Sequence, residues 1–246
     1  MVQDEANSMI RKDEVLREKI YLTRKLSSID PSWLADVYST DLPKDLRYAI
    51  SERLGWLGSK GWGFLKRLIN EEGIQSEFIY ASGLCYQHEA KEWLFNQLQS
   101  KGEFQLEALQ AFSCWGGDCP FKLLEKILTD ESQEIRLAGL KILGFKAHQI
   151  NDELLIKILK EAIGDFREPV VLNAIRILQR RDGSKICNEL AEIVKSRSQK
   201  VANAALIALG SIANTNSKKT LERLIQSLED GPKKEMAIKQ LHQQYK

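Results

Sequence analysis

The chain has 246 residues, of which 43% are hydrophobic, and 36 lysines and arginines against 34 aspartates and glutamates leave a net charge of +2. This composition is typical of a folded globular protein; it excludes an intrinsically disordered chain and argues against nucleic acid as a partner. Charged residues interrupt every apolar run, so we expect no membrane span, and the polar first residues and only four cysteines favour a reduced, cytoplasmic protein.

Residues 1–41 are predicted to form an N-terminal helical cap. Apolar residues recur at helical spacing from Ile10 to Leu26, and a second short helix is expected around Trp33 to Val37. Such a cap would cover the apolar surface that the first of a series of stacked elements leaves exposed.

An internal repeat occupies residues 42–231. The stretch Glu134–Gly144 aligns with Lys200–Gly210 at an offset of two units of 33 residues, and related stretches begin at Phe104 and Val170. After each stretch come a polar break and a second segment with helical periodicity, and no strand pattern is present. The sequence therefore predicts about six helical hairpins that bury their apolar faces only by stacking on one another.

Prolines, glycines and capping residues mark the expected helix ends, and residues 232–246 are predicted to form a C-terminal capping helix. Helix starts are expected at the five prolines, because a missing N–H costs little there: Pro31, Pro43, Pro120, Pro169 and Pro232. The predicted N-caps are Asn151, Ser184 and Asn216, and the predicted helix stops are Gly144, Gly183, Gly210 and Gly231.

The pattern Ile135, Arg136, Ala138 and Leu143-Gly144 resembles that of HEAT-type repeats, in particular the short HEAT-like subtype of phycobilisome lyase chaperones from cyanobacteria. This resemblance implies an all-α, right-handed α-solenoid of stacked hairpins whose second helices line a concave face. It also implies a protein-binding scaffold or assembly chaperone, acting in phycobiliprotein maturation or turnover or in iron–sulfur assembly.

The candidate partner-binding residues are three tryptophans, an aspartate and an arginine. Trp62, Trp93 and Trp115 are expected to contribute to an aromatic surface that binds a protein partner. Asp118 follows Trp115 in the stretch least like a repeat, and Arg136 is the only clear arginine at its repeat position. The alternative interpretation is that the tryptophans pack between hairpins.

Cys85, His88, Cys114 and Cys119 provide three thiols and an imidazole, a donor set that suits zinc or an iron–sulfur cluster and that could also contact a bilin. The set lacks the closely spaced CxxC pairs of most structural metal sites, and Cys85 also fits a small core residue. We therefore expect no cofactor and keep these residues as candidate ligands.

No catalytic residue is predicted, because the three histidines are scattered and neither a nucleophile elbow nor a phosphate-binding loop is present. Alternative functions are a bilin lyase subunit or a DNA glycosylase similar to the HEAT-like alkylpurine glycosylases, in which Trp115, Asp118 and Arg136 would be the counterparts of the active-site residues. The nearly balanced charge argues against the glycosylase.

The second helices carry basic residues interleaved with glutamates, a mixture that favours a solvated face over a nucleic-acid groove. The basic residues are Lys66, Arg67, Lys122, Lys126, Lys157, Lys160, Lys195 and Arg223.

Overall fold

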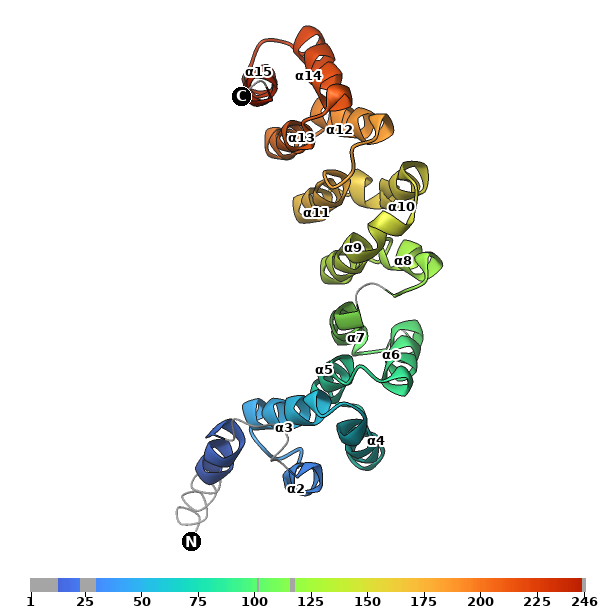
Figure 1. Ribbon diagram of the computed structural model, residues 1–246, viewed down its shortest axis with the longest axis vertical. Coiled ribbons are helices and arrows are strands. Elements are labelled where there is room, and N and C mark those ends of the chain that lie inside the picture. The colour runs from blue at the N-terminus through green and yellow to red at the C-terminus, as the bar shows by residue number, and fades with distance from the viewer. Residues whose placement is uncertain (1–12, 23–29, 101, 116–117, 245–246) are drawn as a thin grey trace. The chain divides into compact units, whose positions relative to one another are not determined.

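The computed structural model describes residues 13–22, 30–100, 102–115 and 118–244, and this part of the chain is helical with connecting turns and no strand (Figure 1). The chain divides into two compact units, residues 1–116 and 117–246.

Residues 13–22 are helical, whereas both Ile10 and Leu26 of the predicted N-terminal helix lie outside the described residues. None of the described helices combines the length and the apolar character needed to cross a bilayer.

Unit 1 contains two complete hairpins. Its helices are α2 (Pro31–Val37), α3 (Lys44–Trp56), α4 (Ser59–Glu72), α5 (Ser76–Leu84), α6 (His88–Ser100) and α7 (Gln105–Phe112), followed by the short turn η2 (Ser113–Trp115). The first helices α3, α5 and α7 pack one on the next, and α4 and α6 are the second helices of their hairpins (Figure 1). Helix α2 packs against α4 and α3.

Unit 2 continues the same pattern. Its elements are α8 (Phe121–Ile127), α9 (Gln133–Lys146), η3 (Ala147–Gln149), α10 (Asp152–Gly164), α11 (Glu168–Leu178), α12 (Ser184–Ser196), α13 (Gln199–Ile212), α14 (Thr215–Ser227) and α15 (Pro232–Gln243). First helices α9, α11, α13 and α15 stack in one row, and second helices α10, α12 and α14 stack in another. The predicted all-α fold of stacked helical hairpins is therefore confirmed.

Small residues let neighbouring first helices approach closely. A Cβ added to Gly55 of α3 would lie 2.6 Å from the carbonyl oxygen of Ala81 in α5, and one added to Gly83 of α5 would lie 2.7 Å from that of Ala111 in α7. In unit 2, Ala174 of α11 and Ala205 of α13 are fully buried. Large apolar side chains such as Leu54 and Phe78 are fully buried in the core of unit 1.

Several predicted helix starts are confirmed. Pro31, Pro169 and Pro232 lie in the first turns of α2, α11 and α15, and Pro43 and Pro120 immediately precede α3 and α8. Asn151 caps α10, because its Oδ1 accepts a hydrogen bond from the N–H of Leu154 at 2.9 Å.

Other predicted helix ends were wrong. Helices α9 and α13 continue past Gly144 and Gly210, because a glycine inside a helix costs only about 1 kcal/mol and tertiary packing offsets this; Gly210 makes room for Gln240 of α15. Gly183 is the N-cap of α12 rather than the stop of α11, so Ser184 is already helical. Likewise, Gly231 is the N-cap of α15.

Helix α14 begins earlier than predicted. Asn214, not Asn216, is its N-cap, and it forms a reciprocal capping box with Ser217. Helix α15 contacts both α13 and α14, in the position of a further first helix. The C-terminal segment therefore follows the repeat register.

Candidate functional site

Two of the predicted partner-binding tryptophans meet on the second helices of unit 1. The rings of Trp62 on α4 and Trp93 on α6 have centroids 6.2 Å apart, with 59° between their planes. Trp62 is only 5% exposed, and Trp93 is partly buried against the same core. The two rings line a shallow pocket of about 330 Å³. Its other residues are Lys66, Ile69, Asn70, Glu89, Glu92 and Asn96.

The polar edge of this pocket is fixed by Glu89 in the first turn of α6. Its Oε2 accepts hydrogen bonds from Lys66 Nζ at 2.6 Å and from Trp62 Nε1 at 3.0 Å. These bonds, Lys66 first, lower the pKa of Glu89. The Trp62 N–H is thereby satisfied, and Lys66 Nζ lies 6.0 Å from the centroid of the Trp62 ring. The ring surface left for an apolar group is therefore mainly that of the partly buried Trp93.

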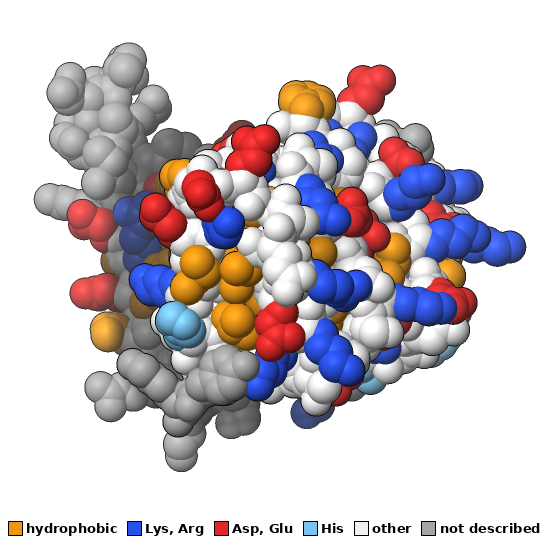
Figure 2. All heavy atoms as spheres, turned by 90° about the horizontal axis from the view of Figure 1, so that it is seen from above, with side chains coloured by type: hydrophobic (Ala, Val, Ile, Leu, Met, Phe, Trp, Pro, Cys, Tyr) orange, Lys and Arg blue, Asp and Glu red, His pale blue; other side chains and the backbone are white. Residues whose placement is uncertain are grey.

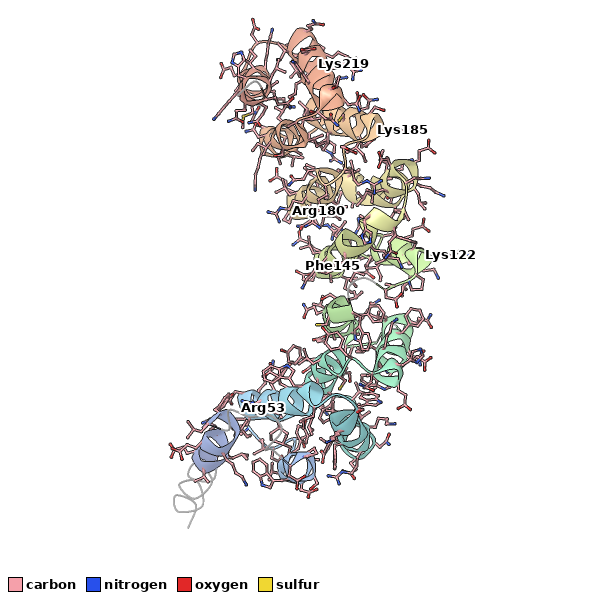
Figure 3. All side chains as sticks on the ribbon, in the orientation of Figure 1. Arg53, Lys122, Phe145, Arg180, Lys185 and Lys219 are labelled. Carbon is pink, nitrogen blue, oxygen red and sulfur yellow. The ribbon has the colours of Figure 1, made fainter. Side chains whose placement is uncertain are left out.

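A second hollow, which the sequence did not indicate, lies between second helices α12 and α14 of unit 2. It consists of two adjoining cavities of about 530 and 240 Å³ that share Asn188, Thr220 and Arg223. Most lining side chains are amides, hydroxyls and charged groups. Figure 3 shows Lys185 on α12 and Lys219 on α14, the two helices that form this groove. In Figure 2, basic and acidic side chains are interleaved over the visible surface.

Trp115 lies apart from the Trp62–Trp93 pocket. Its ring packs on Tyr86 with centroids 5.4 Å apart, and Tyr86 Oη donates to the carbonyl oxygen of Cys114 at 3.2 Å. The Trp115 indole N–H is buried and has no hydrogen-bond acceptor among the described residues. Asp118 is exposed, whereas Gly116 and Gly117, which complete this stretch, lie outside the described residues.

Arg136 is engaged inside unit 2. Its Nη1 donates to Asp165 Oδ2 at 2.8 Å and its Nε to the carbonyl oxygen of Asp130 at 2.5 Å. Asp165 also accepts from Arg167 Nε and Nη2, each at 2.9 Å. The Asp165 side chain is 1% exposed and the two arginines are each 16% exposed. This geometry gives Arg136 a structural role between successive repeats.

Basic residues at the later turns repeat this kind of connection. Arg197 Nη1 donates to the carbonyl oxygen of Asp165 at 3.2 Å, and Lys233 Nζ donates to that of Arg197 at 2.8 Å. Arg167 Nη1 donates to the carbonyl oxygen of Glu131 at 2.7 Å. These cations recur 30 and 36 residues apart in the sequence, each at or next to the start of a first helix, and this recurrence was a usable signal.

The four candidate metal ligands are not assembled into a metal site. In the part of the chain that the structure describes, no three His, Cys, Asp or Glu side chains are grouped as metal ligands. Cys85 and Cys119 are buried, and burial raises the pKa of Cys85 to about 12 and that of Cys119 to about 11. His88 is 81% exposed and its Nδ1 lies 3.5 Å from Glu92. A thiolate, the form that binds metal, is disfavoured at both buried cysteines.

No protein-family model matches the chain, and no curated protein matches it. Among solved structures, the chain is similar to the crystal structure of an engineered protein, with a TM-score of 0.52 and 17% identity over 95% of this chain and 71% of that chain. This similarity concerns the fold alone.

Two further structures are similar at lower TM-scores. Human deoxyhypusine hydroxylase in complex with glycerol has a TM-score of 0.38 and 16% identity, covering 87% of this chain and 83% of that chain. A designed armadillo repeat protein in complex with the peptide (KR)4 has a TM-score of 0.35 and 18% identity, covering 87% and 98%. These scores give no information on activity or ligands.

Proposed function

We propose that this chain is a non-enzymatic binding module that holds a partner protein on the second-helix face of unit 1. The observation that carries the proposal is the pairing of Trp62 with Trp93 across α4 and α6 in a pocket of about 330 Å³. Tryptophan, tyrosine and arginine side chains that become desolvated in well-packed pockets on binding contribute most to protein–protein affinity. A rigid stack of hairpins supplies this surface without ordering a loop, so the entropic cost of association is low.

The pocket favours an apolar side chain of the partner as its occupant. The Glu89 carboxylate already accepts hydrogen bonds from Lys66 Nζ and from the Trp62 N–H. An apolar group that covers the exposed part of Trp93 would be enclosed by a charged rim, which is the usual arrangement at a binding hot spot.

The cellular role we propose is that of an assembly chaperone or adaptor in the cytoplasm. The resemblance to the cyanobacterial HEAT-like group supports a partner in phycobiliprotein maturation or turnover, or in iron–sulfur assembly. The glycosylase alternative is not favoured, because the Arg136 guanidinium that it would use is already bonded to Asp165 and Asp130.

The test is a quantitative affinity purification of the tagged full chain from its own cells, with proteins identified by mass spectrometry. We expect a partner to be enriched by the unmodified protein and lost with Trp93→Ala, since truncating a hot-spot tryptophan costs about 2 kcal/mol or more of binding. The identity of that partner decides between the two proposed roles.

Two further variants separate binding from folding. Asn96→Arg adds bulk at an exposed position of the pocket rim, leaves the core intact and should also abolish partner recovery. Trp56→Ala is the matched control, because Trp56 is 46% exposed on α3 and does not line the pocket. Equal recovery by all four proteins, or no enriched protein at all, would refute the proposal.

A further inference from the structure

We propose that the groove between α12 and α14 is a second, independent docking site, which binds an extended peptide segment through an acidic side chain anchored by Arg223. The groove runs along both helices from Ser184 and Asn216 to Lys195 and Ser227. Ser184 and Lys195 are eleven residues apart on α12, so the groove is roughly 16 Å long along this helix. An extended chain of about five residues has this length.

Arg223 is held in place but retains donors for a ligand. Its Nη2 donates to Asn188 Oδ1 at 3.1 Å and to Thr220 Oγ1 at 3.0 Å, and its Nε lies 3.4 Å from the carbonyl oxygen of Lys219. Among the described residues, Arg223 Nη1 has no acceptor and Arg223 forms no ion pair. A guanidinium fixed by neutral groups is prepared for a carboxylate, because its charge is not yet compensated and its geometry is already set.

The other charges around the groove are consistent with a ligand that carries one or two negative charges. Lys195 is paired with Glu192 at 2.9 Å, whereas Lys219, like Arg223, forms no ion pair in the described part of the chain. Glu222 is the remaining acidic residue of the lining. The unpaired groups of the groove therefore have a small positive excess.

This charge pattern favours an acidic peptide over a nucleic acid. A phosphodiester backbone would bring several charges into a groove of this length, and some would face Glu192 and Glu222. The amides of Asn188, Asn216 and Gln226 can donate to peptide carbonyls and accept from peptide N–H groups, which gives an extended backbone partners whatever its sequence. Carboxylates spaced along a peptide can reach Arg223 and Lys219, and Glu222 in the same cavity limits how much negative charge the groove accepts.

The experiment selects peptides from a random heptapeptide display library on the immobilised full chain and then measures the selected peptides by fluorescence anisotropy. We expect the selected peptides to contain aspartate or glutamate. Arg223→Gln should weaken their binding at least about tenfold, because it removes the charge-assisted hydrogen bonds to the carboxylate. Arg176→Gln is the matched control, since Arg176 is an exposed arginine on α11 that does not line the groove, and it should change nothing.

A variant that binds more tightly is also included, because a folding defect could weaken peptide binding but could not strengthen it. Glu222→Gln removes a carboxylate from the groove lining and should tighten binding of the same peptides. Trp93→Ala in unit 1 should leave peptide binding unchanged, so failure here is distinguishable from failure of the partner-binding proposal.

Four results would overturn the inference: no selected peptide, selection of basic or uncharged peptides, unaltered binding by Arg223→Gln, or displacement of the peptide by a short DNA oligonucleotide at equal concentration.

Discussion

Replacing Asp165 with asparagine should destabilise unit 2 strongly. The carboxylate is 1% exposed and accepts hydrogen bonds from Arg136 Nη1 at 2.8 Å, from the backbone N–H of Arg167 at 2.8 Å, and from two nitrogens of the Arg167 guanidinium. Asparagine has nearly the same shape, but it removes the negative charge and can place an NH₂ group opposite arginine donors. Removing one partner of a buried ion pair costs about 3 to 5 kcal/mol. The arginines remain partly hydrated, so we expect about 3 kcal/mol.

The assay is urea unfolding of the full chain followed by circular dichroism. With a urea dependence of about 3 kcal/mol per molar, this loss would lower the midpoint of the unit 2 transition by roughly 1 M without changing its slope. Glu153→Gln is the control, because the Glu153–Lys185 pair is 67% and 56% exposed and an exposed pair contributes about 0 to 1 kcal/mol. If Asp165→Asn cost no more than this control, the assignment of Asp165 and its arginines as a structural connection would be wrong.

Three further predictions concern pH, packing and thiol reactivity. Burial opposes ionisation of Asp165, but the Arg167 hydrogen bonds and the charges of the two arginines outweigh burial and lower its pKa. The stabilisation by ionised Asp165 should therefore be complete above the ordinary carboxyl pKa of about 4 and be lost as the pH falls through the lower pKa of the folded state. The urea midpoint should fall over this acid range in the unmodified protein, and Asp165→Asn should lack this contribution to the fall. Gly55→Ala should destabilise unit 1 by about 1 to 3 kcal/mol, because the Cβ of the new alanine would lie 2.6 Å from the Ala81 carbonyl oxygen. Thermal unfolding tests this, and an unchanged melting temperature would contradict the close packing of α3 on α5. Iodoacetamide should label half-buried Cys114 in the folded protein. Cys85 should react only after unfolding, because burial raises its pKa to about 12, and labelling of Cys85 in the folded protein, detected by mass spectrometry, would contradict its burial.

The candidate site was predicted only in part. The sequence singled out Trp62 and Trp93 because tryptophans are frequent at binding surfaces, but only the stacking of α4 and α6 brings their rings to 6.2 Å. It also singled out Arg136 as the arginine of its repeat position, and the structure gives that side chain a buried partner in Asp165. The groove at Arg223 was missed, because the mixture of charges along the second helices favoured a solvated face.

Local sequence patterns were enough to predict the all-α hairpin repeat. Apolar residues at spacings of three and four and a period near 33 residues are local properties of the chain, and they require each helix to bury one face against its neighbours. Where the helices end and which partners the polar side chains bind depend instead on contacts between helices. Gly144 and Gly210 remain helical because neighbouring helices pack on them, and Arg136 is structural because a carboxylate 29 residues later in the chain meets it. Such contacts join residues from different repeats, so their energies depend on distances that the local sequence pattern does not contain.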